Sequence, residues 1–165
     1  MRISTLLFPL AALLLASGCS KRATTLITNK EDGWTYAMPA EFVQRSVPLP
    51  KGISQYIGPE DDGYKVNLVI ESIPGTESPE AVGKEIAQKP PPGLIVQEQA
   101  SYGVGSLSGY TVRGTRNNGQ EVQRQVYITD HGICVIFTLT ANAKTFDTWD
   151  QVFHESLAEF HWTKK

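Results

Sequence analysis

Apolar and polar residues alternate along much of the chain beyond residue 30, a pattern that is typical of β-strands with one buried face. The longest alternating stretch is 64–73, and a shorter one covers 53–57. Between them, the sequence Asp-Asp-Gly at 61–63 favours a turn. The two stretches are therefore expected to pair as a hairpin.

Alternating or continuous apolar stretches predict further strands, at 34–38, 42–47, 94–99, 107–115, 120–129 and 132–140. The last of these is the most hydrophobic, which predicts a central place in a sheet. Asn117, Asn118 and Gly119 are expected to join two of the strands in a tight hairpin, because asparagine and glycine tolerate a positive φ.

A helix is expected to begin after Ser78. The serine side chain can accept a hydrogen bond from a free amide, Pro79 suits the first helical turn, and Glu80 favours the positive end of the helix. The helix should run to about Gln88, because Pro-Pro-Pro-Gly at 90–93 forces an extended spacer.

A second helix is expected from about residue 145 to 159. Its apolar residues recur with a period close to 3.6, which predicts that one stripe of the helix covers a sheet. The stripe consists of Phe146, Trp149, Val152, Phe153, Leu157 and Phe160. Hairpin-linked strands with two helices indicate an α+β domain, in which a central antiparallel sheet is flanked by helices.

The N-terminus, residues 1–18, has a different pattern. Arg2 precedes an almost wholly apolar run of 13 residues, 3–15, which is typical of a secretory signal peptide. A bilayer-spanning helix would need roughly 20 such residues. The sequence Ala-Ser-Gly-Cys at 16–19 resembles the lipobox of bacterial lipoproteins. This resemblance implies that a signal peptidase removes residues 1–18 and that Cys19 carries a diacylglyceryl group. The alternative is an ordinary signal peptide that is cut elsewhere.

A lipid on Cys19 implies a palmitate-type membrane anchor and a protein of the cell envelope. Residues 19–30 are then expected to be a lipidated tether, and 31–165 a single domain outside the cytoplasm. Ser20 stands where aspartate would favour retention in the inner membrane, so the outer membrane, facing the periplasm, is expected.

The charge and the cysteines exclude several kinds of partner. The chain has 15 basic and 17 acidic side chains and no basic stripe, so nucleic acid is not expected to bind. The second cysteine, Cys134, lies in an apolar run and is expected to be a buried hydrophobe rather than a reactive thiol. No cysteine pair indicates a metal site, and no cofactor is expected.

The order of these elements resembles the fold shared by the PsbP proteins of photosynthetic membranes, the bacterial DcrB-like envelope lipoproteins and the Ran-binding Mog protein. The resemblance rests on apolar strand patterns and helix starts at Trp34–Pro39, Asn67, Ser78-Pro79-Glu80, Gly109-Tyr110, Gln125–Ile128, Val135–Thr140 and the final helix around His154, ending at Phe160. It implies a central antiparallel sheet between helices and no enzymatic activity. It carries over no functional residue, because the fold serves unrelated functions.

Candidate catalytic and metal-binding groups are few. Asp130 and His131 are expected to lie in a solvated turn, and the glycines between 103 and 109 fit neither a phosphate-binding loop nor a nucleophile elbow. If one helix carries His154 and His161, they lie two turns apart, too far to share a metal ion. The acidic pairs at 31–32 and 60–62 are expected to be solvated turns rather than calcium sites.

Three functional hypotheses remain. The favoured one is a non-catalytic binding or assembly protein of the cell envelope, with an envelope protein or small ligand as its partner. The first alternative is a periplasmic carrier of lipophilic small ligands, which predicts an apolar cavity beneath the terminal helix. The second is a small envelope hydrolase, which predicts that Asp130 and His131 meet a third polar group in a cleft.

Overall fold

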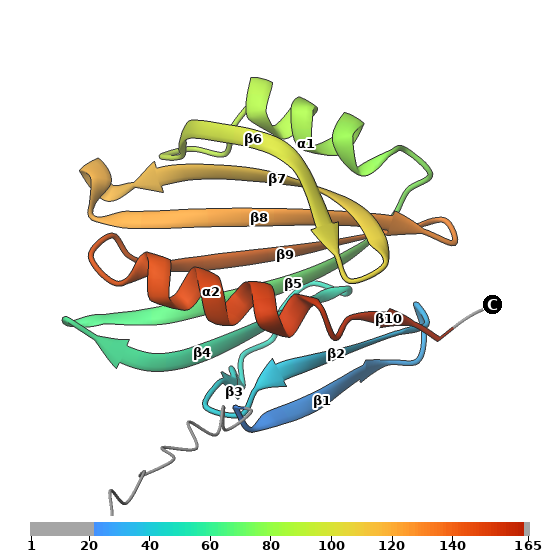
Figure 1. Ribbon diagram of the computed structural model, residues 1–165, viewed down its shortest axis with the longest axis horizontal. Helices are drawn as coiled ribbons and strands as arrows, with labels where there is room; N and C mark the ends of the chain where they lie inside the picture. Colours follow the sequence, from blue (N-terminus) through green and yellow to red (C-terminus); the bar gives the residue numbers. More distant parts are fainter. Residues whose placement is uncertain (1–21, 164–165) are drawn as a thin grey trace, which may run out of the picture.

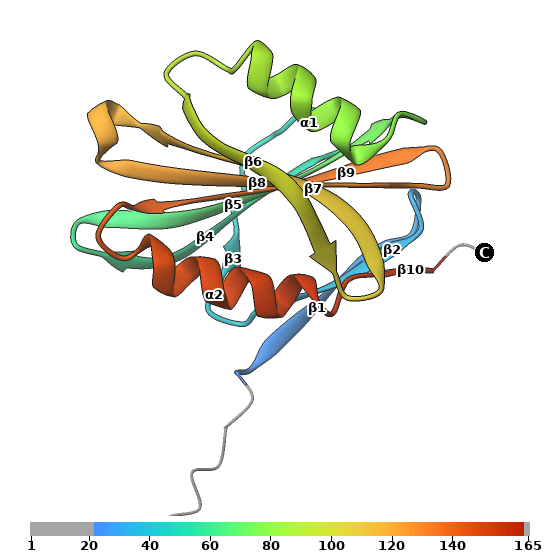
Figure 2. The same cartoon turned by 45° about the horizontal axis from the view of Figure 1, so that its top comes forward.

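The computed structural model describes residues 22–163 and contains two layers packed on a large antiparallel sheet (Figure 1). Helix α1 (Pro79–Gln88) packs on one face of this sheet. Helix α2 (Phe146–Leu157) and a small second sheet pack on the other (Figure 2). The predicted signal peptide and Cys19 lie outside the described residues. The α+β class and the central antiparallel sheet flanked by helices are confirmed.

The large sheet has seven strands in the order β3-β4-β5-β9-β8-β7-β6, and all neighbours are antiparallel. In chain order these are β3 (Val43–Gln44), β4 (Ile53–Asp61), β5 (Tyr64–Pro74), β6 (Ile95–Val104), β7 (Leu107–Arg116), β8 (Glu121–Asp130) and β9 (Ile133–Asn142). The β4–β5 hairpin is confirmed, and β9 is the central strand, as its hydrophobicity predicts. In the β7–β8 turn η1 (Asn117–Gly119), Asn117 and Asn118 have φ of 49° and 55°.

The small sheet has the order β1-β2-β10 and was not predicted from the sequence. Its strands are β1 (Thr24–Asn29), β2 (Trp34–Pro39) and β10 (His161–Trp162). Strand β1 corrects the prediction that residues 19–30 are a tether without secondary structure. Of the β1 residues only Ile27 packs against the core, so no alternation marks the strand. Strand β1 forms because all of its residues, 24–29, pair with β2.

Both predicted helices are present. Ser78 caps α1 by accepting a hydrogen bond from the Ala81 amide at 3.2 Å. Gly83 faces the sheet, where a Cβ atom would overlap the ring of Tyr110, so glycine lets α1 approach closely. Helix α2 ends two residues before the predicted 159, because the chain turns at Ala158 to reach β10.

The two faces of the large sheet have separate hydrophobic cores. The smaller core lies under α1 and includes Tyr127 and Cys134. The larger core lies between the sheet, α2 and the small sheet. Four residues of the predicted α2 stripe belong to it, namely Phe146, Phe153, Leu157 and Phe160, and the half-buried Trp149 packs at its margin. At its centre four aromatic rings pack together, those of Trp34, Tyr36, Phe137 and Phe160.

Two of the buried tyrosines, Tyr36 and Tyr127, predict how stability depends on pH. Both are completely buried, and burial raises the pKa of each above the usual 10.0. The folded protein therefore keeps two protons that the unfolded chain loses above pH 10, so stability is complete below pH 10 and falls above it. Each of these two tyrosines is expected to contribute about 1.4 kcal/mol to the loss in the free energy of unfolding at about pH 11.

Urea unfolding at a series of pH values measures this loss. Tyr36→Phe keeps the ring but removes the ionisable hydroxyl, so its free energy of unfolding should fall by about 1.4 kcal/mol less than that of the wild type between pH 9 and about pH 11. A free energy that stays constant over this range in the wild type would contradict the prediction.

Candidate functional site

A groove opens between the small sheet and the edge of the large sheet. Its cavity volume is about 850 Å³. One wall is formed by residues 26–32, from β1 and the β1–β2 turn, and the other by 51–54, at the start of β4. The remaining lining residues are Trp34, Gln44, Tyr56, Ile70, Ser72, Pro74 and Ile133. We call this cavity the inter-sheet groove.

The floor of the groove is rigid and partly apolar. The rings of Trp34 and Tyr56 are buried and face it together with Ile70. The Trp34 indole N–H donates a hydrogen bond of 3.0 Å to Ser72 Oγ, which joins the small sheet to β5. Buried apolar and aromatic side chains beside a few fixed polar groups are typical of sites that bind a ligand or a peptide.

The rim of the groove carries charges from both walls. Lys51 Nζ lies 2.5 Å from Glu31 Oε1, and this ion pair raises the pKa of the exposed lysine. Asn29 holds the β1–β2 turn through two hydrogen bonds of its side chain. Its Nδ2 donates to Asp32 Oδ2 at 2.7 Å, and its Oδ1 accepts from the Asp32 backbone N–H at 3.0 Å. The predicted solvated acidic turn at 31–32 is thus part of the rim.

Strand β1 presents a free edge to this groove. Within residues 22–163, β1 pairs with β2 alone. The Ala40 amide donates to the Ala23 carbonyl at 3.0 Å, and bonded positions alternate along antiparallel strands. The N–H and C=O groups of Thr24, Leu26 and Thr28 therefore point away from β2. Such an edge can pair with another extended backbone.

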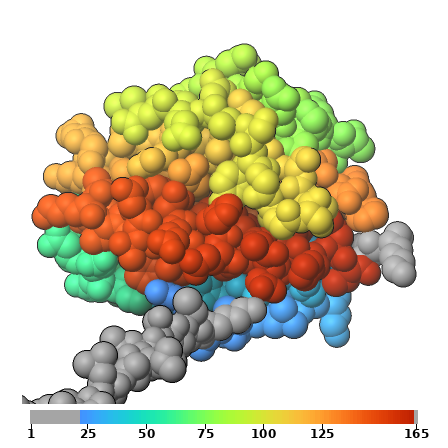
Figure 3. Space-filling view, in the orientation of Figure 1, coloured from blue at the N-terminus to red at the C-terminus, as the bar shows by residue number. Residues whose placement is uncertain are grey.

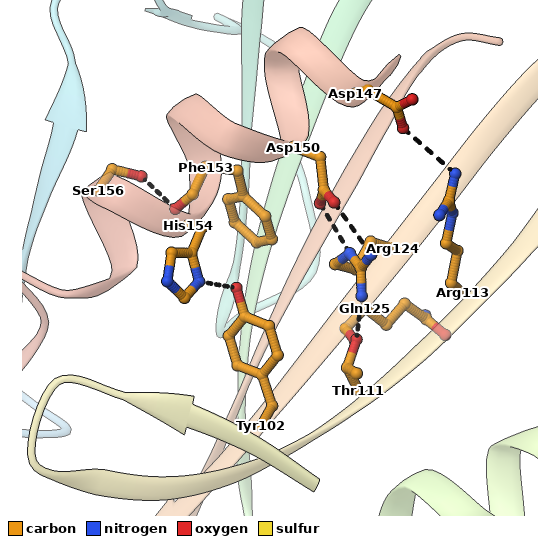
Figure 4. Close-up of polar contacts among 10 residues, drawn as sticks. All are labelled: Tyr102, Thr111, Arg113, Arg124, Gln125, Asp147, Asp150, Phe153, His154 and Ser156. Atoms are coloured by element: carbon orange, nitrogen blue, oxygen red, sulfur yellow. Dashed lines mark hydrogen bonds and ion pairs between the residues drawn. The ribbon is translucent and has the colours of Figure 1, made fainter. Parts of the chain in front are cut away.

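A polar network fastens α2 to the large sheet (Figure 4). Arg124 of β8 donates from Nε and Nη2 to the two carboxylate oxygens of Asp150, at 2.7 and 2.9 Å. Its third nitrogen, Nη1, donates to Thr111 Oγ1 at 3.3 Å. Beside this pair, Arg113 of β7 reaches Asp147 Oδ1 at 3.4 Å and lies over the ring of Phe146. These contacts hold the helix rather than form a reactive centre.

His154 makes a separate polar contact from the same helix. Its Nδ1 is 2.6 Å from the hydroxyl of Tyr102, whose pKa burial raises to about 12. One helix does not carry both His154 and His161, because α2 ends at Leu157 and His161 belongs to β10. Among the described residues, no group of three or more acidic, histidine or cysteine side chains could hold a metal ion.

The pair Asp130 and His131 lies at the exposed tip of the β8–β9 hairpin. Their side chains are 3.6 Å apart, and the His131 ring packs against Trp162 rather than against a third polar group. The cleft that the hydrolase hypothesis predicts is therefore not formed around this pair. Cys134 is 1% exposed, and burial raises the pKa of its thiol, which confirms its prediction as a buried side chain.

The space beneath α2 is filled. In Figure 3, atoms of α2 and of the β6–β7 hairpin cover this side of the molecule. The cavity between α2 and the small sheet measures only about 10 Å³, no more than the space for one water molecule. The apolar cavity that the carrier hypothesis predicts is thus not found there.

Sequence reasoning missed the inter-sheet groove altogether. Its two walls are about 20 residues apart in the chain, and one of them, β1, was assigned to the tether. The only signal in the sequence was the β-branched and apolar content of residues 24–28, which is too weak without the pairing partner.

Comparisons with known proteins support the fold. No family model and no curated protein matches the sequence. Among solved structures, the chain is similar to cyanobacterial PsbP (CyanoP) from Synechocystis sp. PCC 6803, with 14% identity and a TM-score of 0.63 over 91% of this chain and 98% of that one. It is also similar to the Ran-binding protein Mog1p of Saccharomyces cerevisiae, with 10% identity and a TM-score of 0.58 over 87% and 97% of the two chains.

A third similar structure is LpqN of Mycobacterium tuberculosis, which is involved in cell envelope biogenesis. It has 16% identity and a TM-score of 0.55 over 86% of this chain and 91% of that one. At these identities the likeness shows the fold alone, and the predicted PsbP- and Mog-like fold is confirmed. The likeness to DcrB-like lipoproteins stays a prediction. Neither helix in residues 22–163 is long and apolar enough to cross a membrane.

Proposed function

We propose that this chain is a non-catalytic binding protein of a bacterial cell envelope, anchored to a membrane by a lipid on Cys19, and that it binds an envelope protein in the inter-sheet groove. The observation that carries the proposal is the groove itself, with its rigid floor and the free edge of β1 along one wall. The similar folds of a Ran-binding protein and of a protein involved in cell envelope biogenesis support a binding role.

The geometry favours a partner with an extended segment. The outward N–H and C=O groups of β1 can form hydrogen bonds with an added strand, which provide affinity. The side chains along β1 can then set the register of that strand. Leu26 is 66% exposed at this edge and offers an apolar contact that no other part of the described chain covers. Ile53 and Ser54 lie on the facing wall of the groove.

The lipid anchor is supported by the sequence at 16–19. A lipidated Cys19 would keep the domain outside the cytoplasm, and we propose the outer membrane, with the domain facing the periplasm, from Ser20. With two or three acyl chains the attachment would be effectively permanent.

A crosslinked pull-down of the full-length protein from membranes tests the proposal. Leu26→Asp places a charge at the free edge of β1 and should lower the recovery of the partner at least tenfold. Ile95→Asp is the matched control, because Ile95 is also 66% exposed but lies on β6, the opposite edge of the large sheet. Recovery with Ile95→Asp should equal that of the wild type.

Cys19→Ala separates anchoring from binding. We expect this variant to lose the partner, because without the lipid it no longer reaches the membrane. Equal recovery with Leu26→Asp and the wild type would contradict binding in the inter-sheet groove. Equal recovery with Cys19→Ala would contradict the role of the anchor.

A further inference from the structure

The link between Cys19 and the folded domain is very short. The first described residue, Arg22, is three positions after Cys19, and β1 begins at Thr24. A chain spans at most about 3.6 Å per residue, so Arg22 lies within roughly 11 Å of Cys19. If Cys19 carries a lipid, the part of the domain around Arg22 must lie at the bilayer surface.

The structure shows which segment neighbours this entry point. Arg22 forms an ion pair with Glu41, and the Ala23 carbonyl accepts a hydrogen bond of 3.0 Å from the Ala40 amide. Strand β3 begins two residues after Glu41, at Val43. The chain from 43 to 51 therefore starts beside the point where the anchor joins the domain.

The segment 43–51, which we call the β3–β4 segment, has an unusual surface. Every residue in it is exposed, including three large aliphatic ones: Val43 is 68% exposed, Val47 40% and Leu49 36%. Among the described residues only Leu26 and Ile95 are other large hydrophobic side chains as exposed as these. Exposed apolar side chains gathered in one region indicate an interaction surface.

The charges near this segment favour an acidic surface. Residues 43–51 contain Arg45 and Lys51 but no aspartate or glutamate, and Lys51 is paired with Glu31 at the groove rim. The sequence between Cys19 and β1 adds Lys21, while Arg22 and Glu41 compensate each other as an ion pair. Basic residues close to a lipid anchor are attracted to membranes that contain anionic lipids.

We propose that the β3–β4 segment contacts the lipid bilayer, with Val43, Val47 and Leu49 in the interface and Arg45 at acidic headgroups. This inference rests on the lipid anchor of the proposed function. Apolar side chains beside cations are the composition by which surface segments bind at the headgroup boundary. The contact would give the domain one fixed orientation on the membrane, which a flexible tether alone would not.

Bilayer contact leaves the inter-sheet groove accessible. Gln44 lines the groove, and side chains alternate between the two faces of a strand, so Val43 lies on the opposite side of β3. Arg45 follows β3 and does not line the groove. Val47 and Leu49 do not line the groove either. The bilayer and the partner would therefore use different surfaces of the same region.

A fluorescent label on the lipidated full-length protein tests the inference. Val47→Cys, coupled to an environment-sensitive probe, is reconstituted into vesicles of phosphatidylethanolamine and phosphatidylglycerol that carry brominated acyl chains. Labelling should be specific, because lipid occupies the Cys19 sulfur and Cys134 is 1% exposed. Ile95→Cys is the matched control on β6, at the far edge of the sheet.

The inference predicts that the label at position 47 shifts its emission to the blue and loses more than half of its intensity to the brominated lipids, while the label at 95 does neither. Val43→Cys should behave as Val47→Cys does. Flotation of the vesicles is read in the same samples. If the protein floats with the vesicles but positions 43 and 47 behave as 95 does, the anchor stands and the bilayer contact is wrong. If the protein does not float with the vesicles, the proposed lipid anchor on Cys19 is wrong, and the bilayer contact that depends on it is wrong too.

Discussion

Phe137→Ala is expected to lower the free energy of unfolding by about 3–5 kcal/mol, because a fully buried ring is removed from the centre of the larger core. The Phe137 ring packs 5.0 Å from that of Tyr36 and 5.6 Å from that of Phe160, measured between centroids. It also meets Trp34 edge to face. The cavity left by alanine would loosen the contact between the central strand and the small sheet.

Chemical denaturation of the wild type and the variant measures this effect. Phe137→Leu is the control, since it keeps most of the volume and should cost less than about 1.5 kcal/mol. Because Trp34 forms part of the groove floor, Phe137→Ala should also weaken partner binding more than Phe137→Leu. If Phe137→Ala costs less than about 1 kcal/mol, the ring does not hold the two sheets together as described.

Asp150→Ala is expected to have the second largest effect, a loss of about 3 kcal/mol in the free energy of unfolding. The variant leaves the Arg124 guanidinium, 9% exposed, without its carboxylate partner. Breaking a buried ion pair from one side costs about 3–5 kcal/mol, and the lower end applies because Asp150 keeps a side-chain exposure of 22%. The midpoint temperature of thermal unfolding should fall by roughly 10 °C.

The double variant Arg124→Met and Asp150→Leu separates the charge effect from lost packing. Apolar side chains of similar volume often replace a buried ion pair at little cost, so the double variant should recover most of the lost stability. A double variant as unstable as Asp150→Ala would show that the pair contributes through its hydrogen bonds to the network, including the one to Thr111, rather than through charge compensation.

The sequence predicts the large sheet well, because its long strands have either an alternating or a continuous apolar pattern and several are joined by recognisable turns. The hairpin at 117–119 and the helix cap at Ser78 depend on local chemistry that single residues reveal. Central placement of β9 follows from its continuous apolar run, which needs cover on both faces. These features depend on residues close together in the chain, so they can be recognised from the sequence.

The small sheet and the groove could not be predicted, because they depend on contacts between distant segments. Strand β1 is mostly exposed and β10 has two residues, so neither carries a hydrophobic period. The ion pair across the groove joins Glu31 to Lys51, and nothing local relates the two. The candidate site thus arises from tertiary pairing, whereas the predicted chemical residues, Asp130 and His131, lie at an exposed tip.

The most direct test of binding in the inter-sheet groove is site-specific photocrosslinking in living cells. A photoreactive amino acid is placed at Leu26 or at Ile95 of the full-length protein, and crosslinked products are identified by mass spectrometry. Position 26, at the free edge of β1, should capture one envelope protein. Position 95, equally exposed on β6, should not capture it. No product from position 26, or the same product from both positions, would contradict a partner site in this groove.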